Sequence, residues 1–120
     1  MILIVDDNAG MRQTVKAMLM ELDSAFCECD DGSKALEMYR TYHPDWVLMD
    51  VRMPVVDGIT ATHRIKEVFP DARVIIVSGY NDPLLKKQAH EAGAVSYVLK
   101  DDLSPLLNII AEDRGGRHDQ

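Results

Sequence analysis

The sequence predicts an α/β domain with a doubly wound parallel sheet of five strands, and three observations support this prediction. Short apolar runs alternate with segments whose apolar residues recur at three- and four-residue steps, so strands alternate with helices. Each crossover is long enough to return the chain in the same direction, which makes the sheet parallel. The 120 residues suffice for one packed core but not for two, so we expect one domain.

The predicted strands are short apolar runs. Residues 1–5 form an unbroken apolar run that ends at Asp6 and Asp7, as expected for a strand buried on both faces of the sheet. The four later strands are predicted at residues 25–29, 46–49, 73–77 and 95–99.

The first three predicted helices follow from apolar spacing and from residues that begin or end a helix. The second begins at residues 31–33 and stops near His43, because a residue before proline disfavours helical angles. Pro70 closes the third. The apolar positions are Met11, Val15, Met18, Leu19 and Leu22 for the first, Ala35, Leu36 and Tyr39 for the second, and Ile59, Ile65 and Val68 for the third.

The last two helices begin at a capping residue followed by proline. Asp82 and Pro83 predict an N-cap and first helical position, and Gly93 suits the left-handed residue that ends that helix. Ser104 and Pro105 repeat the start signal. We assign residues 1–112 to the domain and expect the polar tail, residues 113–120, to fray.

Composition excludes several classes of function. The 13 basic and 20 acidic residues give a net charge of -7, and the basic residues are scattered, which argues against binding nucleic acid or an anionic membrane surface. No apolar run approaches the roughly 18 residues that span a bilayer. The run from Ile2 to Val5 lacks the preceding basic segment of a signal peptide, so we expect a cytoplasmic location.

The cysteines and histidines show no metal-ligand spacing. Cys27 and Cys29 are two apart in a predicted strand, which favours packing in a reducing compartment over a redox or metal role. We expect the histidines at the surface or at helix ends; they are His43, His63, His90 and His118.

Polar residues follow four of the predicted strands at their carboxyl ends, where open parallel sheets bind ligands. They are Asp6 and Asp7, Asp50, Ser78 and Lys100. If the strand order is 2-1-3-4-5, the first and third strands are neighbours at the reversal of strand order, and the three aspartates converge there. Each signal alone is more often a turn or a helix cap. Together they predict a ligand site.

The residue types at these strand ends suit a divalent cation and a phosphoryl group. Carboxylates at ~4 Å repel each other by about 1 to 4 kcal/mol per pair, so a positive charge must offset them. Oxygen ligands suit Mg²⁺, while Lys100, the Ser78 hydroxyl and the Gly79 backbone N–H suit phosphoryl oxygens. Phosphoryl transfer needs little beyond such positioning and charge neutralisation.

From Ile2 to about Ala111, the chain resembles the receiver domains of two-component response regulators. The resemblance implies a flavodoxin-like three-layer sandwich, and the Lys-Asp after the fifth strand is similar to receivers of helix-turn-helix transcription regulators. The motifs that carry it are Leu3-Ile-Val-Asp-Asp7, Val47-Leu-Met-Asp50, Met53-Pro54, Asp57-Gly58, Val77-Ser78-Gly79, Ala92-Gly93-Ala94 and Tyr97-Val-Leu-Lys100.

The resemblance also implies roles for individual residues. Asp50 would accept a phosphoryl group from a phosphohistidine on a histidine kinase or a histidine phosphotransfer protein. Asp7 would bind Mg²⁺ directly (Mn²⁺ is an alternative) and Asp6 mainly through water, with Asp50 and the backbone carbonyl of Arg52 as further ligands. Lys100, Ser78 and Gly79 would bind the phosphoryl group. Ser78 and Tyr97 would act as the switch; a half-buried strand tyrosine without that role is the alternative for Tyr97.

The sequence departs from the family pattern at three places. Lys100 is followed by Asp101 rather than by a proline in a cis bond. Arg52 and Tyr80 occupy positions that line the path of the hydrolytic water in the family, so we expect them to tune phosphoryl lifetime. Asn8 and Ala9 carry no side chain able to act as an extra base.

The expected function is a phosphorylation-activated switch that catalyses only its own phosphotransfer and autodephosphorylation. Its target would bind helix four, strand five and helix five through a surface that includes Lys86, Lys87, His90 and Tyr97, and a homodimer on phosphorylation is a further expectation. Three alternatives stay open. They are the receiver half of a DNA-binding transcription regulator, an unphosphorylated degenerate receiver, and a metal-dependent phosphatase, which would need a carboxylate where Arg52 stands.

Overall fold

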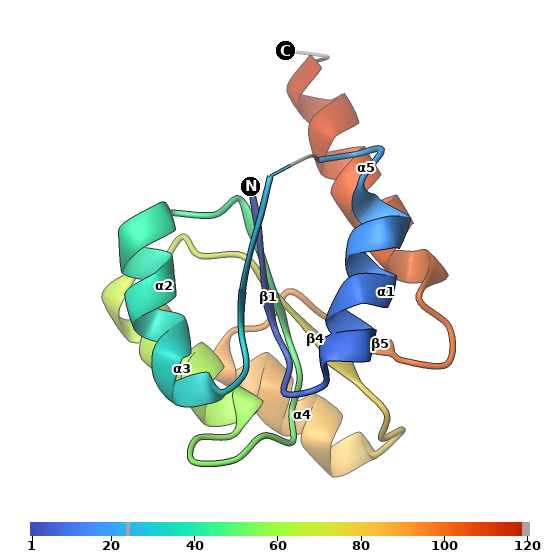
Figure 1. The fold of residues 1–120 in the computed structure, drawn as a ribbon. Helices are drawn as coiled ribbons and strands as arrows, with labels where there is room; N and C mark the ends of the chain where they lie inside the picture. Colours follow the sequence, from blue (N-terminus) through green and yellow to red (C-terminus); the bar gives the residue numbers. More distant parts are fainter. Residues whose placement is uncertain (24, 119–120) are drawn as a thin grey trace.

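Five short strands form one parallel sheet in the order β2-β1-β3-β4-β5, which confirms the predicted topology (Figure 1). The structure is a computed structural model that describes residues 1–23 and 25–118. The strands are β1 (Ile2–Val5), β2 (Phe26–Cys29), β3 (Trp46–Met49), β4 (Val74–Ser78) and β5 (Ser96–Leu99).

Helices cover both faces of the sheet, which makes three layers (Figure 1). One face packs against α1 and α5 through Val15, Leu19, Leu106 and Ile110. The other face packs against α2, α3 and α4. The helical elements are α1 (Ala9–Leu19), the 3₁₀ turn η1 (Gly32–Lys34), α2 (Ala35–Tyr42), α3 (Gly58–Val68), α4 (Pro83–Ala92) and α5 (Ser104–His118).

The burial of each strand follows its place in the sheet. Every residue of β1, β3 and β4 is buried, because these strands have neighbours on both edges and helices on both faces. The edge strands β2 and β5 are only partly buried. The unbroken apolar runs at the first and third strands therefore mark the interior of the sheet.

Several element boundaries differ from the prediction by a few residues. α1 ends at Leu19 rather than near Leu22, because the N–H groups of Leu22 and Asp23 both donate to the Leu19 carbonyl and close a turn. The second helix begins only after η1. Its end before Pro44 is confirmed: His43 adopts a left-handed conformation with φ 44° and terminates α2.

The predicted caps of α4 are confirmed. The Asp82 side chain accepts from the N–H of Leu84 at 2.8 Å, Pro83 is the first helical residue, and Gly93 ends the helix with φ 105°. At α5 the cap differs, because Asp102 supplies the accepting oxygen and Ser104 donates to it with both its N–H and its hydroxyl.

α5 continues to His118, past residue 112 where the sequence predicts that a fraying tail begins. Residues 113–118 of the predicted tail therefore belong to α5. The division into a domain of residues 1–112 and a tail of residues 113–120 stays a prediction.

Cysteines and histidines lie where the sequence analysis expects them, as far as their side chains are described. Cys27 and Cys29 are free thiols, and both pack against the core formed by α2, α3 and α4. His63 and His90 are exposed on helices, and His43 is the residue that ends α2. The side chain of His118 lies outside the described ones.

No helix in residues 1–23 and 25–118 combines the length and apolar character needed to cross a membrane.

Candidate functional site

The carboxyl ends of β1 and β3 bring the predicted site together. Val5 pairs with Met49 in the sheet register, so Asp6 and Asp50 follow neighbouring strands at the same level. The Asp50 N–H donates to the Val5 carbonyl at 2.9 Å, which extends this pairing by one residue. The two carboxylates therefore leave the sheet side by side.

Asp6, Asp7 and Asp50 form one acidic cluster. Each offers a carboxylate oxygen, and these oxygens all lie within 4.8 Å of one another. Asp6 and Asp50 are buried, with 4% and 6% of their surface exposed, whereas Asp7 is exposed. The cluster is thus closed toward the core and open toward solvent on the side of Asp7.

Lys100, which follows β5, contacts two carboxylates of this cluster. Its Nζ lies 3.0 Å from Oδ2 of Asp6 and 3.3 Å from Oδ1 of Asp50. Burial disfavours the charged form of Lys100 and so acts to lower its pKa. The hydrogen bond to Asp6 and the charge of Asp50 outweigh this effect and raise the pKa of Lys100 above its ordinary value. Lys100 therefore stays cationic and offsets part of the carboxylate repulsion.

The environment of the Asp50 carboxyl shifts its pKa upward. Burial, and then the negative charge of Asp6, raise the pKa of Asp50 to about 6, although Lys100 and the N–H of Val51 act in the opposite direction. The Val51 N–H donates to Oδ1 of Asp50 at 2.9 Å, on the oxygen that also contacts Lys100. Asp50 is therefore a carboxylate at neutral pH, with more basic oxygens than an exposed aspartate and a fixed orientation.

Both carboxylate oxygens of Asp6 already have protein partners. Oδ1 accepts from the backbone N–H of Asn8 at 2.9 Å, and Oδ2 contacts Lys100. Asn8, which the sequence analysis dismissed as an extra base, instead caps α1 by accepting from the N–H of Met11. Asn8 thereby fixes the turn that carries Asp6 and Asp7.

Ser78 and Gly79 lie at the end of β4, on the far side of β3 from Asp6. Ser78 is fully buried, and its Oγ accepts from the N–H of Tyr80 at 3.0 Å. A Cβ at Gly79 would meet no atom within 4 Å, so the space above this backbone is open. The Ser78 hydroxyl is engaged within its own loop rather than with the acidic cluster.

Tyr97, Tyr80 and Arg52 form a connected group beside the site. The Tyr97 hydroxyl donates to the Tyr80 carbonyl at 2.6 Å, and the Tyr97 ring packs against the core. The guanidinium of Arg52 lies over the Tyr80 ring, 4.6 Å from its centroid. These two large side chains, which follow β3 and β4 respectively, are therefore stacked on each other.

Two residues that shape the backbone around Asp50 and Asp6 were not predicted to do so from the sequence. A Cβ at Gly58 would lie 1.7 Å from the Asp50 carbonyl oxygen, so only glycine allows α3 to begin this close to Asp50. The Asp57-Gly58 pair could have indicated this, because Asp57 is the N-cap of α3. The second residue is Arg12, which donates to the carbonyl of Asp6 at 2.6 Å.

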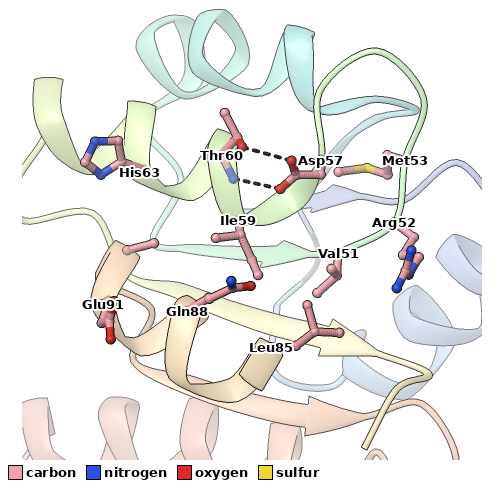
Figure 2. Close-up of a pocket in the computed structure, with 11 residues that line it drawn as sticks. Val51, Arg52, Met53, Asp57, Ile59, Thr60, His63, Leu85, Gln88 and Glu91 are labelled. Atoms are coloured by element: carbon pink, nitrogen blue, oxygen red, sulfur yellow. Dashed lines mark hydrogen bonds between the residues drawn. The ribbon is translucent and has the colours of Figure 1, made fainter. Parts of the chain in front are cut away.

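A hollow of about 740 Å³ lies between α3 and α4. Figure 2 shows the side chains that line it. Ile59 extends into it from α3 and Leu85 from α4, and Asp57 caps the start of α3 through its hydrogen bonds to Thr60 (Figure 2). Asp6, Asp7 and Asp50 are not among its lining residues. The acidic cluster is therefore separate from this hollow, whose lining residues Val51 and Arg52 closely follow Asp50 in the chain.

The fold is a doubly wound parallel sheet with an acidic cluster and a lysine at its carboxyl rim, the edge at which sheets of this class bind ligands. The family model described as the response regulator receiver domain matches residues 2–111. The chain belongs to this family, the receiver domains of two-component signalling systems.

Relatives and solved structures agree with this assignment. The chemotaxis protein CheY of Halobacterium salinarum is 38% identical over 106 residues, which cover 88% of each chain. The transcriptional regulatory protein DegU of Brevibacillus brevis is 35% identical, and the match covers 91% of this chain but 48% of DegU. CheY in a CheX-CheY complex with BeF3 and Mg²⁺ from Borrelia burgdorferi has a TM-score of 0.74 at 32% identity, with 89% of this chain and 83% of that one covered.

Proposed function

We propose that this receiver is a phosphorylation-activated switch of a two-component phosphorelay, which accepts a phosphoryl group onto Asp50 in a Mg²⁺-dependent reaction. The observation that carries the proposal is the convergence of three carboxylates and Lys100 at the carboxyl rim of the sheet. The known relatives provide the signalling context.

The donor set fits a hard divalent cation, Mg²⁺ or alternatively Mn²⁺, because it consists of oxygens. Asp7 suits a direct ligand since it is exposed. Asp6 suits contact through water since both its oxygens have protein partners. Asp50 and the backbone carbonyl of Arg52 complete the proposed set. When bound, the cation neutralises the carboxylates and the incoming phosphoryl oxygens.

Each residue of the site has a separate role in the phosphoryl-transfer step. A carboxylate oxygen of Asp50 forms a bond to phosphorus while the bond from phosphorus to the donor imidazole nitrogen breaks, and that electron pair leaves with the imidazole. Lys100 neutralises charge on the phosphoryl oxygens. The Ser78 hydroxyl and the Gly79 N–H donate hydrogen bonds to the same group.

Tyr80 links the two proposed switch residues through its backbone. Its N–H donates to Ser78 Oγ, and its carbonyl accepts from the Tyr97 hydroxyl. When Ser78 turns toward a phosphoryl oxygen, it releases the Tyr80 N–H, and the loop that Tyr97 holds changes shape. The surface of α4, β5 and α5 changes with it, including Lys86, whose Nζ lies 5.9 Å from the Tyr97 ring centroid.

The partners follow from this chemistry. A sensor histidine kinase or a histidine phosphotransfer protein supplies the phosphoryl group in the cytoplasm, and a downstream target binds the surface of α4, β5 and α5, where phosphorylation could also favour a homodimer. The domain itself contacts neither nucleic acid nor membrane. The chain has no separate turnover substrate, because Arg52 stands where a metal-dependent phosphatase needs a carboxylate.

The receiver half of a DNA-binding regulator is the second candidate. The match to DegU, which covers about half of that protein, favours it. Reading the gene beyond the codon for Gln120 separates the two candidates, since a following helix-turn-helix segment would establish the second.

The phosphoacceptor proposal is tested with the purified protein, Mg²⁺ and a small phosphodonor such as acetyl phosphate. We expect a single acid-stable, base-labile adduct that Asp50→Ala removes. Asp57→Asn is the matched control, because it changes a neighbouring exposed carboxylate and keeps the cap of α3. An adduct that persists in Asp50→Ala contradicts the proposal.

A further inference from the structure

Arg12, in the first turn of α1, connects three elements around the acidic cluster. Its Nη1 donates to the backbone carbonyl of Asp6 at 2.6 Å, and its Nε donates to Oε1 of Glu28 at 2.9 Å. Glu28 lies on β2, next to β1, and its other oxygen accepts from Lys16 at 2.8 Å. α1, β2 and the end of β1 are therefore tied together by one guanidinium.

The hydrogen bond from Arg12 satisfies the backbone carbonyl of Asp6, directly after the end of β1. The N–H of Asp6 still donates to the carbonyl of Cys29 on β2 at 3.2 Å, whereas the Asp6 carbonyl lies past the last residue of β1 and accepts from Arg12. The side-chain oxygens are held separately by Asn8 and Lys100. Asp6 is thus fixed at four atoms, and Asp7 follows on the same backbone.

We propose that Arg12 is a positioning residue that holds the turn of Asp6 and Asp7 in the shape that binds a divalent cation, with Glu28 as its anchor. The inference rests on the proposed function of the site. Arg12 is thereby added to the proposed functional residues, and it belongs neither to the acidic cluster nor to the switch residues, nor is it Lys100.

The anchor suits this task because it is itself well held. Glu28 accepts from Lys16 and from Arg12, and its pKa lies below the ordinary value because these hydrogen bonds outweigh burial. The side chain of Arg12 is 18% exposed, so water has little access to its contacts. Arg12 presents a planar fork with several donors, which lets it bind both Asp6 and Glu28 at once.

The loss of Arg12 should change the affinity for Mg²⁺ in opposite directions, depending on whether Arg12 acts through its charge or by positioning the turn. As a nearby positive charge, Arg12 repels a cation, so its removal on charge grounds tightens Mg²⁺ binding. As a positioning residue, its removal loosens the turn and weakens Mg²⁺ binding. The sign of the change in the dissociation constant therefore decides between the two.

The experiment compares Arg12→Met with Lys16→Met by calorimetric titration of Mg²⁺ alone. Both variants lose one positive charge that contacts Glu28, but only Arg12 contacts the Asp6 carbonyl. We expect Arg12→Met to raise the dissociation constant by roughly 10-fold, as loss of outer contacts does at metal sites. We expect Lys16→Met to leave it unchanged or slightly lower. Equal or tighter binding by Arg12→Met overturns the proposal.

A second readout uses the metal-free protein. Amide hydrogen exchange at Asp7 and Asn8 should be faster in Arg12→Met than in Lys16→Met, and equal rates count against positioning. If Arg12→Met does not fold, Arg12→Lys replaces it, with weaker Mg²⁺ binding expected although the charge is kept. Absence of Mg²⁺ binding by the unchanged protein refutes the proposed function itself, whereas normal binding with an unaffected Arg12→Met refutes only the role of Arg12.

Discussion

The Nζ atom of Lys100 lies 3.3 Å from Oδ1 of Asp50, on the same carboxylate oxygen that accepts from the Val51 N–H. One strand end supplies the nucleophile of the proposed reaction, and another supplies the cation beside it. The contact holds Asp50 in place before any phosphoryl group arrives. It also limits how far burial can raise the pKa of that carboxyl.

Replacing Lys100 with methionine should therefore raise the pKa of Asp50 above about 6 in the metal-free protein, because the nearest cation is lost. Carboxyl-carbon NMR titration measures this directly. Phosphorylation by acetyl phosphate should slow by about 10²-fold, the usual effect of removing one stabilising group from a transition state. Lys87→Met is the control, since Lys87 lies on α4 away from the cluster; an unchanged Asp50 pKa in Lys100→Met contradicts the prediction.

Asp50 should make the metal-free protein less stable as pH rises. Its folded pKa of about 6 exceeds the ordinary value of 3.8, so the folded state binds the proton more tightly. The stabilisation is fully present below the ordinary pKa and is lost as pH rises through about 6. Asp50→Asn lacks this titration. At about pH 8 we expect Asp50→Asn to be more stable than the unchanged protein by about 1 to 3 kcal/mol.

Urea unfolding in the presence of a chelator, at a series of pH values, measures this difference. The advantage of Asp50→Asn should shrink as pH falls through about 6 toward 3.8. An advantage that is constant with pH would show that Asp50 does not titrate in this range.

Gly58 and Gly79 should respond oppositely to the same substitution. A Cβ at Gly58 would lie 1.7 Å from the Asp50 carbonyl oxygen, whereas one at Gly79 would meet nothing within 4 Å. We expect Gly58→Ala to reduce the free energy of unfolding by about 3 kcal/mol, because backbone must move to admit the methyl group. Gly79→Ala should change it by less than about 0.5 kcal/mol. Similar effects of the two, in urea unfolding, would contradict the close packing of α3 on Asp50.

The stack of Arg52 on Tyr80 should control access of water to a phosphorylated Asp50. The two side chains lie 4.6 Å apart, measured from the guanidinium carbon to the ring centroid. We expect Arg52→Ala and Tyr80→Ala each to change the dephosphorylation rate, and the double variant to change it by less than the product of the two, because each loses the same stack. Loss of adduct over time after removal of the phosphodonor measures the rate. Unchanged rates in both single variants argue against the hypothesis.

The sequence predicts the fold and the acidic cluster well because both depend on local patterns. Each buried strand is an unbroken apolar run, and a polar residue directly after it must leave the sheet at the carboxyl rim; Asp6 and Asp50 follow this rule. Helix ends were predicted where a residue has one dominant conformational role, as Pro83 and Gly93 do.

Features that depend on contacts between distant segments could not be predicted in this way. The tie of Arg12 to both Asp6 and Glu28 requires the register of β1 on β2, and nothing near Arg12 in the sequence indicates it. The close approach of Gly58 to Asp50 likewise requires the loop between β3 and α3 to be in place. The end of α1 differs from the prediction because Leu22 continues the apolar spacing although the chain has already turned.

The most direct measurement is to locate the phosphoryl group. Borohydride reduces an aspartyl phosphate to homoserine, so peptide mass spectrometry after reduction identifies the modified position. We expect homoserine at position 50 alone, formed with Mg²⁺ and absent when a chelator replaces it. Homoserine at Asp6, Asp7 or Asp57, or full modification without a divalent cation, would contradict it.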